Sequence, residues 1–213
     1  MMHVFQTGGD IHRATAAEIN HVAPDMVTKE MRNAAKALNF GILYGMGQRS
    51  FAETAGIDTK TAKLFIEEYF KNFSGVAAFI EQTKVSAKKH GFAQTLLGRK
   101  RWLPDLRTQN PMLRNAAERM AQNMPTQGLQ ADIIKIAMVR VAQEVLAKHA
   151  HDDVRLLLQI HDELIFEVKD DILKKIAVAI HSIMESAFPL RVPIRVDVKT
   201  GKRWSELRPF DIV

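Results

Sequence analysis

Two apolar runs separated by three ionisable residues constrain how the last third of this sequence can fold. Leu156–Leu158 and Leu164–Phe166 have the composition of buried strands, and His161, Asp162 and Glu163 lie between them. Burying a carboxylate without a partner costs on the order of several kcal/mol, so the acidic residues must reach solvent or a cation. We therefore predict an antiparallel hairpin with these residues at its tip, about three residues separating the two strands.

The chemistry of the hairpin tip leaves two interpretations open. The tip lacks Gly, Asn and Pro, the residues that usually form turns. It could be a solvated acidic turn. Alternatively, Asp162 and Glu163 could supply oxygen ligands to a magnesium ion, which prefers hard carboxylate donors and would balance their charge.

Most of the first 150 residues have helical patterns, and the strand patterns come later. Asp10, Thr28 and Asp58 each precede such a pattern and are good N-caps. Pro125 is expected to interrupt a long helix, because proline lacks an amide donor and clashes with the preceding turn. Helices and strands in this order predict an α+β fold, mostly helical and ending in a small antiparallel sheet packed by helices. The expected helices cover 10–19, 29–44, 58–73, 74–90, 111–124, 127–148 and a segment capped by Asp171; the expected strands cover 92–97, 100–103, 155–160, 164–168 and 192–198.

Bulk composition narrows the class of partner. The chain of 213 residues carries 30 Lys and Arg against 24 Asp and Glu, a formal charge of +6 that points weakly toward a polyanionic partner; the alternative is simple solubility, which charge alone favours. It has no cysteine, which excludes disulfides and thiolate metal sites and predicts a reducing, cytoplasmic compartment. No apolar run approaches the roughly 18 residues that a membrane span needs, so no membrane partner is expected.

A stripe of cations and rings marks the segment 29–44. On a helix, Arg32, Lys36, Phe40 and Tyr44 lie four residues apart and share one face. With a rise of about 1.5 Å per residue the stripe spans roughly 18 Å, the reach of a nucleotide from triphosphate to base. Cations can neutralise phosphates, and a ring can stack on a sugar or base. The alternative is a solvated basic edge with two core aromatics. Gly41 costs about 1 kcal/mol in a helix and so needs a reason.

Two further stretches could contact nucleic acid. Arg119, Asn123 and Gln127 share one face around Pro125, and side chains on a concave bend can reach the edges of bases in a minor groove. Ordinary surface amides are the alternative. Gly98-Arg-Lys-Arg-Trp102 is a basic turn that could hold a phosphate backbone or simply be exposed.

Taken together, these stretches resemble the polymerase domain of family A DNA polymerases, the bacterial DNA polymerase I type. The resemblance covers nearly the whole chain, in order, and implies a helical fingers region over 1–110 followed by part of a palm over 111–213. It rests on Asp10-Ile-His-Arg-Ala-Thr-Ala-Ala-Glu18, the helix with Arg32, Lys36, Phe40, Gly41 and Tyr44, Leu97-Gly-Arg-Lys-Arg-Trp-Leu-Pro-Asp105, Asn123-Met-Pro-Thr-Gln-Gly128 and Gln159-Ile-His-Asp-Glu-Leu164.

The resemblance implies a nucleotide site on the early helices. Arg32 and Lys36 correspond to cations that bind the incoming triphosphate, and His12 to a histidine that contacts its phosphates. Phe40 corresponds to the residue that packs on the sugar and disfavours dideoxynucleotides. Tyr44 corresponds to the residue that guards the template-base pocket.

The resemblance also implies DNA contacts and a metal ligand. Arg119, Asn123 and Gln127 would contact primer and template in the minor groove, and His161 the primer terminus. Asp162 corresponds to a metal-binding catalytic carboxylate and Glu163 to its auxiliary neighbour. The implied partners are primer-template DNA and deoxynucleoside triphosphates, and the implied location is the bacterial nucleoid.

One departure from the family pattern affects activity. The family uses two Mg²⁺ ions, and the first carboxylate lies in a motif like Asp-Tyr-Ser-Gln-Ile-Glu, upstream of the region that matches Asp10. This sequence begins after that point, so the second ligand set is missing from it. A two-metal site must hold both ions about 3.5–4 Å apart, which Asp162 and Glu163 alone leave half built. The strand that carries the motif would pair beside Leu156–Ile160, so we expect an exposed apolar sheet edge.

Three functions therefore remain open. The chain could be the later part of a DNA polymerase, with little activity alone and completed by further polypeptide or by a complementary polymerase chain. It could instead be a non-catalytic DNA-binding module derived from a polymerase. A structural helical domain with accidental motifs is the third possibility.

Overall fold

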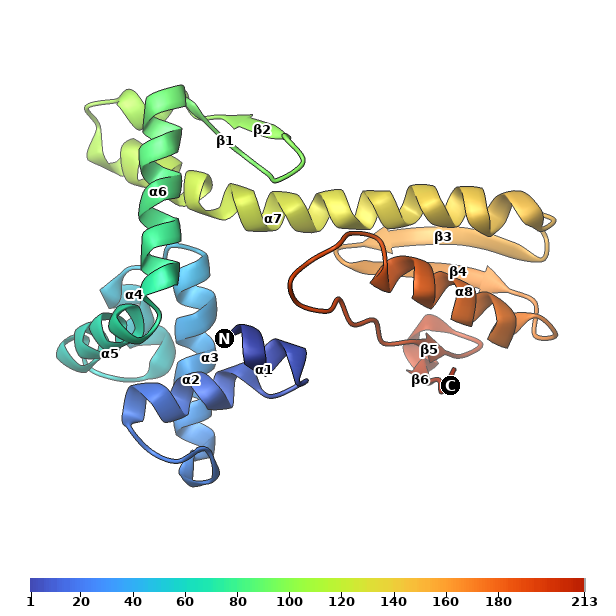
Figure 1. The fold of residues 1–213 in the computed structure, drawn as a ribbon, viewed down its shortest axis with the longest axis horizontal. Coiled ribbons are helices and arrows are strands. Elements are labelled where there is room, and N and C mark those ends of the chain that lie inside the picture. The colour runs from blue at the N-terminus through green and yellow to red at the C-terminus, as the bar shows by residue number, and fades with distance from the viewer. Residues whose placement is uncertain (213) are drawn as a thin grey trace. The chain divides into compact units, whose positions relative to one another are not determined.

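The computed structural model describes residues 1–212, which form two compact units (Figure 1). The first unit is Met1–Leu129, and the second begins at Gln130. Helices dominate and the sheets are small and antiparallel, which confirms the α+β class. The boundary between the units falls inside one long helix. The proposed division into functional regions at residue 110 concerns roles rather than packing and stays a prediction.

The first unit is built from helices with well-defined caps. Side-chain oxygens of Asp10, Thr28 and Asp58 accept hydrogen bonds from first-turn amides, which confirms these three predicted helix starts. Two short helices, α1 and α4, were not predicted. The helices are α1 Met2–Gln6, α2 Ile11–Asn20, α3 Lys29–Leu43, α4 Gln48–Ala55, α5 Thr59–Asn72 and α6 Ser74–His90.

The main core of the first unit joins α3, α4 and α5. Leu38 and Phe51 are each 1% exposed, and Ala62 and Tyr69 are buried against them. Burial raises the pKa of Tyr69 to about 12, so its ring stays neutral in this core. This packing fixes the inward face of α3 and leaves its opposite face free for the cationic and aromatic stripe.

Truncating the core residue Leu38 tests this packing. We expect Leu38→Ala to lower the free energy of unfolding by about 2–5 kcal/mol, because it removes buried methyl groups and leaves a cavity. Chemical denaturation followed by circular dichroism measures the loss. Leu64→Ala is the matched control, because Leu64 is 56% exposed and its truncation should cost at most about 0.5 kcal/mol. Equal losses for both variants would contradict the assigned core.

A short hairpin packs next to α6. Strands β1 (Phe92–Gln94) and β2 (Lys100–Trp102) pair antiparallel, as predicted. Gly98 has a φ of +83°, a left-handed conformation that favours glycine and so explains its place in the turn. The exposed Trp102 ring meets Phe92 edge to face at 5.1 Å, and the Lys100 ammonium lies 4.5 Å from the Phe92 ring centre.

The predicted break at Pro125 is wrong. Helix α7 runs unbroken from Pro111 to Glu144 with Pro125 inside it. An interior proline costs about 3 kcal/mol, but burial on both sides holds this helix together. Ala121 and Met124 pack in the first unit, and Ala137 and Val141 are buried in the second. Local propensity is overridden here by tertiary packing.

In the second unit, a two-stranded hairpin packs against α8 (Leu173–Glu185) and the end of α7 (Figure 1). Strands β3 (Val154–Ile160) and β4 (Glu163–Val168) pair antiparallel, with an irregularity between Leu156 and Leu158. The shared core includes Val154 and Phe166. The expectation that the whole run 156–158 is buried is wrong, because Leu157 and Leu158 are 49% and 47% exposed.

The C-terminal segment differs from its prediction. Residues 192–198 show the expected alternation of exposed and half-buried side chains, but they form no ladder in the part of the chain that the structure describes. Only β5 (Lys199–Thr200) and β6 (Arg208–Pro209) pair there. Helix α8 starts after Ile172 without a side-chain cap, so the predicted Asp171 cap is also wrong. Across residues 1–212, no helix is both long and apolar enough for a membrane span.

Candidate functional site

A single carboxylate organises the start of α2 and the cation of α3. Asp10 Oδ1 accepts hydrogen bonds from the backbone N–H groups of His12 and Arg13, at 2.9 and 3.1 Å. Its Oδ2 accepts from Arg32 Nε at 2.6 Å. The Arg32 hydrogen bond is the main reason that the pKa of Asp10 lies below its ordinary value. Asp10 thus caps α2 and also orients Arg32, a role that its sequence context did not indicate.

His12 lies between the cations and the rings. Its Nδ1 is 3.1 Å from Asn39 Nδ2, and its ring centre is 5.6 Å from that of Phe40. Burial lowers the pKa of His12; Asp10 opposes this, and Arg32 and Lys36 add to it. The imidazole is therefore neutral at pH 7 and can act as a hydrogen-bond donor.

The predicted stripe exists on the outer face of α3. Phe40 and Tyr44 are each 44% exposed, and their rings are nearly parallel with centres 6.5 Å apart. The interpretation of these rings as core aromatics is therefore wrong. Lys36 is exposed and has no ion-pair partner among residues 1–212, which leaves its ammonium free for a ligand. The structure thus brings the five predicted nucleotide-binding residues together on α2 and α3.

The need for Gly41 has a packing explanation. Gly41 is buried, and a Cβ there would lie 3.0 Å from Met46 Sδ. The chain doubles back after α3, and Met46 N–H donates to the Gly41 carbonyl at 2.7 Å. Close approach of Met46, rather than a ligand, accounts for this glycine.

Helix α7 is fastened to the end of α3. Gln122 is buried, and its Nε2 donates to the Ile42 carbonyl at 2.5 Å. Gly45, at a φ of +71°, lies so close to α7 that a Cβ would be 2.9 Å from Arg119 Cγ. The predicted DNA contact Arg119 therefore adjoins the turn that follows Tyr44. Sequence reasoning missed Gln122, whose only signal is a polar residue on the apolar face of the helix.

The other two predicted contacts on α7 differ in exposure. Asn123 is half-buried, and its Oδ1 is buried with no hydrogen-bond partner among the described residues. An orphaned carbonyl oxygen costs about 1–3 kcal/mol unless water or a ligand donates to it. Gln127 is exposed. Gly128 packs against the β1–β2 hairpin, since a Cβ there would lie 2.5 Å from Thr95 Cγ2.

The hairpin tip in the second unit is tighter than expected. Only His161 and Asp162 form the loop, and Glu163 is the first residue of β4, paired with Ile160. His161 has a φ of +52°, a left-handed conformation uncommon for residues other than glycine. Gln159 Nε2 supports the loop by donating to the His161 carbonyl at 2.7 Å. Such local strain tends to occur at functional sites.

Both tip carboxylates are exposed and available. Neither the Asp162 nor the Glu163 side chain has a hydrogen bond or ion pair with another described residue. Within residues 1–212 no group of three or more acidic or histidine side chains is placed to hold a metal. The two carboxylates suit Mg²⁺ chemically, which takes one or two protein carboxylates and keeps several waters. Their assignment as metal ligands stays a prediction.

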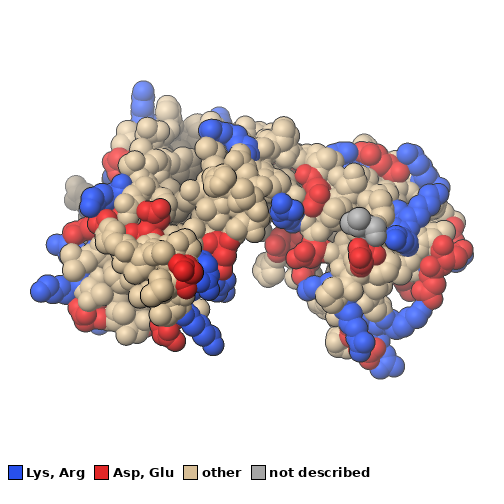
Figure 2. Space-filling view, turned by 60° about the horizontal axis from the view of Figure 1, so that its bottom comes forward, with Lys and Arg blue, Asp and Glu red and all other residues tan. Residues whose placement is uncertain are grey.

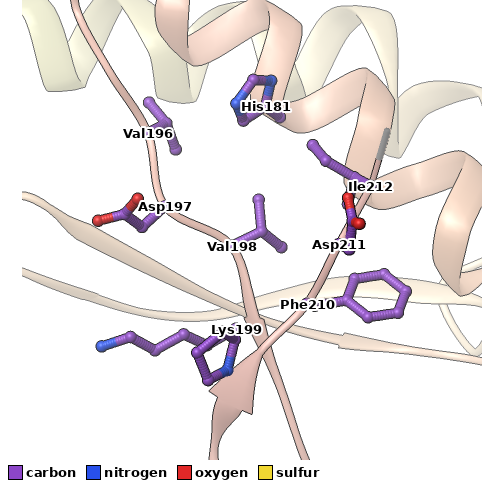
Figure 3. Close-up of a pocket in the computed structure, with 9 residues that line it drawn as sticks. His181, Val196, Asp197, Val198, Lys199, Phe210, Asp211 and Ile212 are labelled. Atoms are coloured by element: carbon purple, nitrogen blue, oxygen red, sulfur yellow. The ribbon is translucent and has the colours of Figure 1, made fainter. Parts of the chain in front are cut away.

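The surface away from the predicted site residues includes a hollow in the second unit. Figure 2 shows Lys and Arg interspersed with Asp and Glu over the visible face rather than gathered in one band. A hollow of about 530 Å³ in the second unit is lined by His181, by 196–199 and by 209–212 (Figure 3). His181 lies 3.4 Å from Glu185 Oε1, and none of the predicted site residues lines this hollow.

Comparison with known proteins identifies a family and several relatives that this chain resembles in sequence. The model of DNA polymerase family A matches residues 1–206. The chain is 44% identical over 208 residues to the thermostable DNA polymerase I of Thermus filiformis, covering 98% of this chain and 24% of that protein. It is 40% identical over 206 residues to DNA polymerase I of Pseudomonas aeruginosa, covering 97% and 22%. The chain thus spans about a quarter of the length of these relatives.

A solved structure agrees with the sequence relatives. The Pol1 polymerase domain from M. smegmatis, in complex with DNA primer-template and dNTP, superposes with a TM-score of 0.83 at 40% identity. The match covers 90% of this chain and 34% of that one. Sequence relatives, the family match and the shared fold agree: this chain belongs to DNA polymerase family A.

Proposed function

We propose that these residues bind the incoming nucleotide and supply one carboxylate arm of the active site in a template-directed DNA polymerase. The observation that carries the proposal is the cluster on α2 and α3. There a free ammonium at Lys36, an oriented guanidinium at Arg32 and two parallel exposed rings share one surface. A triphosphate matches the cations, and a sugar and base match the rings.

The roles of the individual residues are the ones that the family resemblance implies. Arg32, Lys36 and His12 contact the triphosphate, Phe40 packs on the sugar, and Tyr44 borders the template-base pocket. The M. smegmatis relative is bound to primer-template DNA and dNTP, which supports the same two partners for this chain. The DNA itself is contacted by Arg119, Asn123, Gln127 and His161. The protein then acts on DNA in the bacterial cytoplasm, at the nucleoid.

The hairpin tip supplies metal ligands. Asp162, with Glu163 beside it, would hold Mg²⁺ through exposed carboxylates that have no other partner among residues 1–212. An ion held there would supply Lewis-acid chemistry, lowering the pKa of the primer 3′-hydroxyl and offsetting charge on the leaving pyrophosphate. The 3′-hydroxyl would lose its proton to solvent water, its oxygen would form a bond to the α-phosphorus, and the bond from that phosphorus to pyrophosphate would break. Residues outside this sequence, in further polypeptide or in a complementary chain, provide the other carboxylate of the two-metal site.

Primer extension by the 213-residue chain alone tests whether the two-metal site needs a carboxylate from outside this sequence. We expect the purified chain with Mg²⁺ and deoxynucleotides to extend a primed template at under about one-thousandth of the rate of a complete enzyme, since the metal clamp is half built. The reference is a hybrid polymerase in which this chain replaces the matching segment of the T. filiformis enzyme. Extension by the isolated chain near the hybrid's rate, and lost in Asp162→Ala, would refute the need for completion.

A further inference from the structure

A chain of hydrogen bonds with a fixed direction leads from the buried side of α2 to His12. Thr15 is fully buried, and its hydroxyl donates to the Ile11 carbonyl at 2.8 Å. The competing direction, toward Asn39 Oδ1, is longer at 3.3 Å. A hydroxyl has one proton, so Thr15 Oγ1 acts as an acceptor toward Asn39.

The Asn39 amide extends this chain of hydrogen bonds from Thr15 to His12. Its Nδ2 lies 3.1 Å from Thr15 Oγ1 and 3.1 Å from His12 Nδ1. An amide nitrogen carries two hydrogens and no acceptor, so both contacts are donations from Asn39. His12 Nδ1 must then be an unprotonated acceptor, and the ring hydrogen must be on Nε2. The other ring nitrogen, Nε2, has no partner among the described residues.

We propose that Asn39 is a positioning residue that holds His12 as the neutral Nε2–H tautomer, so that the site presents a hydrogen-bond donor to the nucleotide phosphates. The phosphate part of this inference rests on the function proposed above. An Nδ1–H tautomer would turn a lone pair at Nε2 toward the phosphates, which repels their oxygens. An imidazolium would set an N–H against the Asn39 amide hydrogens.

The charges around His12 agree with a neutral ring. Asp10 faces it from the N-cap of α2 and favours protonation, whereas Arg32 and Lys36 on α3 disfavour it. Burial is the largest cause and also favours the neutral form, so the pKa of His12 lies below its ordinary value. Burial and the neighbouring charges thus favour the neutral form of His12, and Asn39 selects which neutral tautomer it adopts.

Nitrogen-15 NMR of the full 213-residue chain tests the tautomer directly. Long-range ¹H–¹⁵N correlations are expected to show His12 protonated at Nε2, with a pKa below 6.5. In Asn39→Asp the new carboxylate can accept a hydrogen bond from a protonated His12 Nδ1. The neutral ring should therefore change to the Nδ1–H tautomer, and the pKa of His12 should rise. Asn33→Asp, an exposed change of the same kind on α3, should leave the pattern unchanged.

The wild-type spectrum alone can overturn the inference. An Nδ1–H pattern for the neutral ring would refute it even if a variant failed to fold. Thr15→Val is a second probe, because it removes the acceptor that orients Asn39 while keeping the side-chain shape. It should produce a mixture of the two neutral tautomers. An unchanged, pure Nε2–H form would show that Thr15 does not orient Asn39.

Addition of a nucleotide separates the tautomer from the proposed function. Deoxyguanosine triphosphate should shift the His12 Nε2 signal of the wild-type chain, and deoxyguanosine without phosphates should not. An Nε2–H tautomer that does not respond to the triphosphate would leave Asn39's role intact and refute phosphate contact by His12. An Nδ1–H tautomer that does respond to the triphosphate would support phosphate contact by His12 and refute the role of Asn39.

Discussion

Replacing Asp162 with alanine in the hybrid polymerase is expected to abolish primer extension, with a loss of at least about 10³-fold. Removing a single preorganised electrostatic group from an active site already costs about 10²–10³ in rate, and a metal ligand also places the ion. Stability should change by no more than about 0.5 kcal/mol, because the Asp162 side chain is exposed and has no partner among residues 1–212. Single-turnover extension and thermal unfolding of the same preparations measure the two quantities.

The matched control for Asp162 is another acidic turn residue of the same hairpin. Asp152 is 87% exposed and lies at the opposite end of β3, next to His151. Asp152→Ala removes the same charge from another exposed turn and should leave extension within about twofold. Asp162→Ala activity within about tenfold of the unmodified hybrid would rule out Asp162 as a metal ligand. Loss of activity together with unfolding would instead place it among structural residues.

Local signals in the sequence predicted three helix caps and two hairpins. Asp10, Thr28 and Asp58 cap helices because their side chains satisfy amides two or three residues away, an effect confined to a few neighbouring positions. The hairpin at Gly98 depends on a backbone conformation that glycine adopts at little cost. The stripe from Arg32 to Tyr44 was predicted because helical spacing alone places these residues on one face.

The wrong and missing predictions depend on contacts distant in sequence. Helix α7 continues through Pro125 because buried residues in both units hold it. The segment 192–198 keeps its alternation, but a strand also needs a neighbour to pair with, which periodicity cannot supply. The pair of Asp10 with Arg32 spans 22 positions, and that of Gln122 with Ile42 spans 80. No pattern within a short window indicates either.

Replacing Arg32 with alanine in the hybrid polymerase is expected to lower kcat/KM for deoxynucleotides by about 10²-fold, while the dissociation constant for primed DNA changes less than about threefold. Arg32 is a predicted phosphate ligand that the structure holds in place through its bond to Asp10. Loss of charge-assisted hydrogen bonds to a triphosphate costs about 1.5–3 kcal/mol, and each 1.4 kcal/mol is tenfold. Arg32→Lys should restore little, because lysine lacks the planar fork of donors. Steady-state extension kinetics and filter binding of primed DNA measure the two effects.

A double mutant separates two explanations of that loss. Arg32→Ala also leaves the Asp10 carboxylate without its cation, and this bare negative charge could repel the triphosphate by itself. Asp10→Asn removes the charge and keeps a side chain that can cap α2. If Arg32 contacts phosphate, Arg32→Ala with Asp10→Asn should remain at least about tenfold below the Asp10→Asn single variant in kcat/KM. Recovery of the double mutant to the level of Asp10→Asn would mean that Arg32 serves only to neutralise Asp10, and equal losses of nucleotide use and DNA binding would count against both explanations.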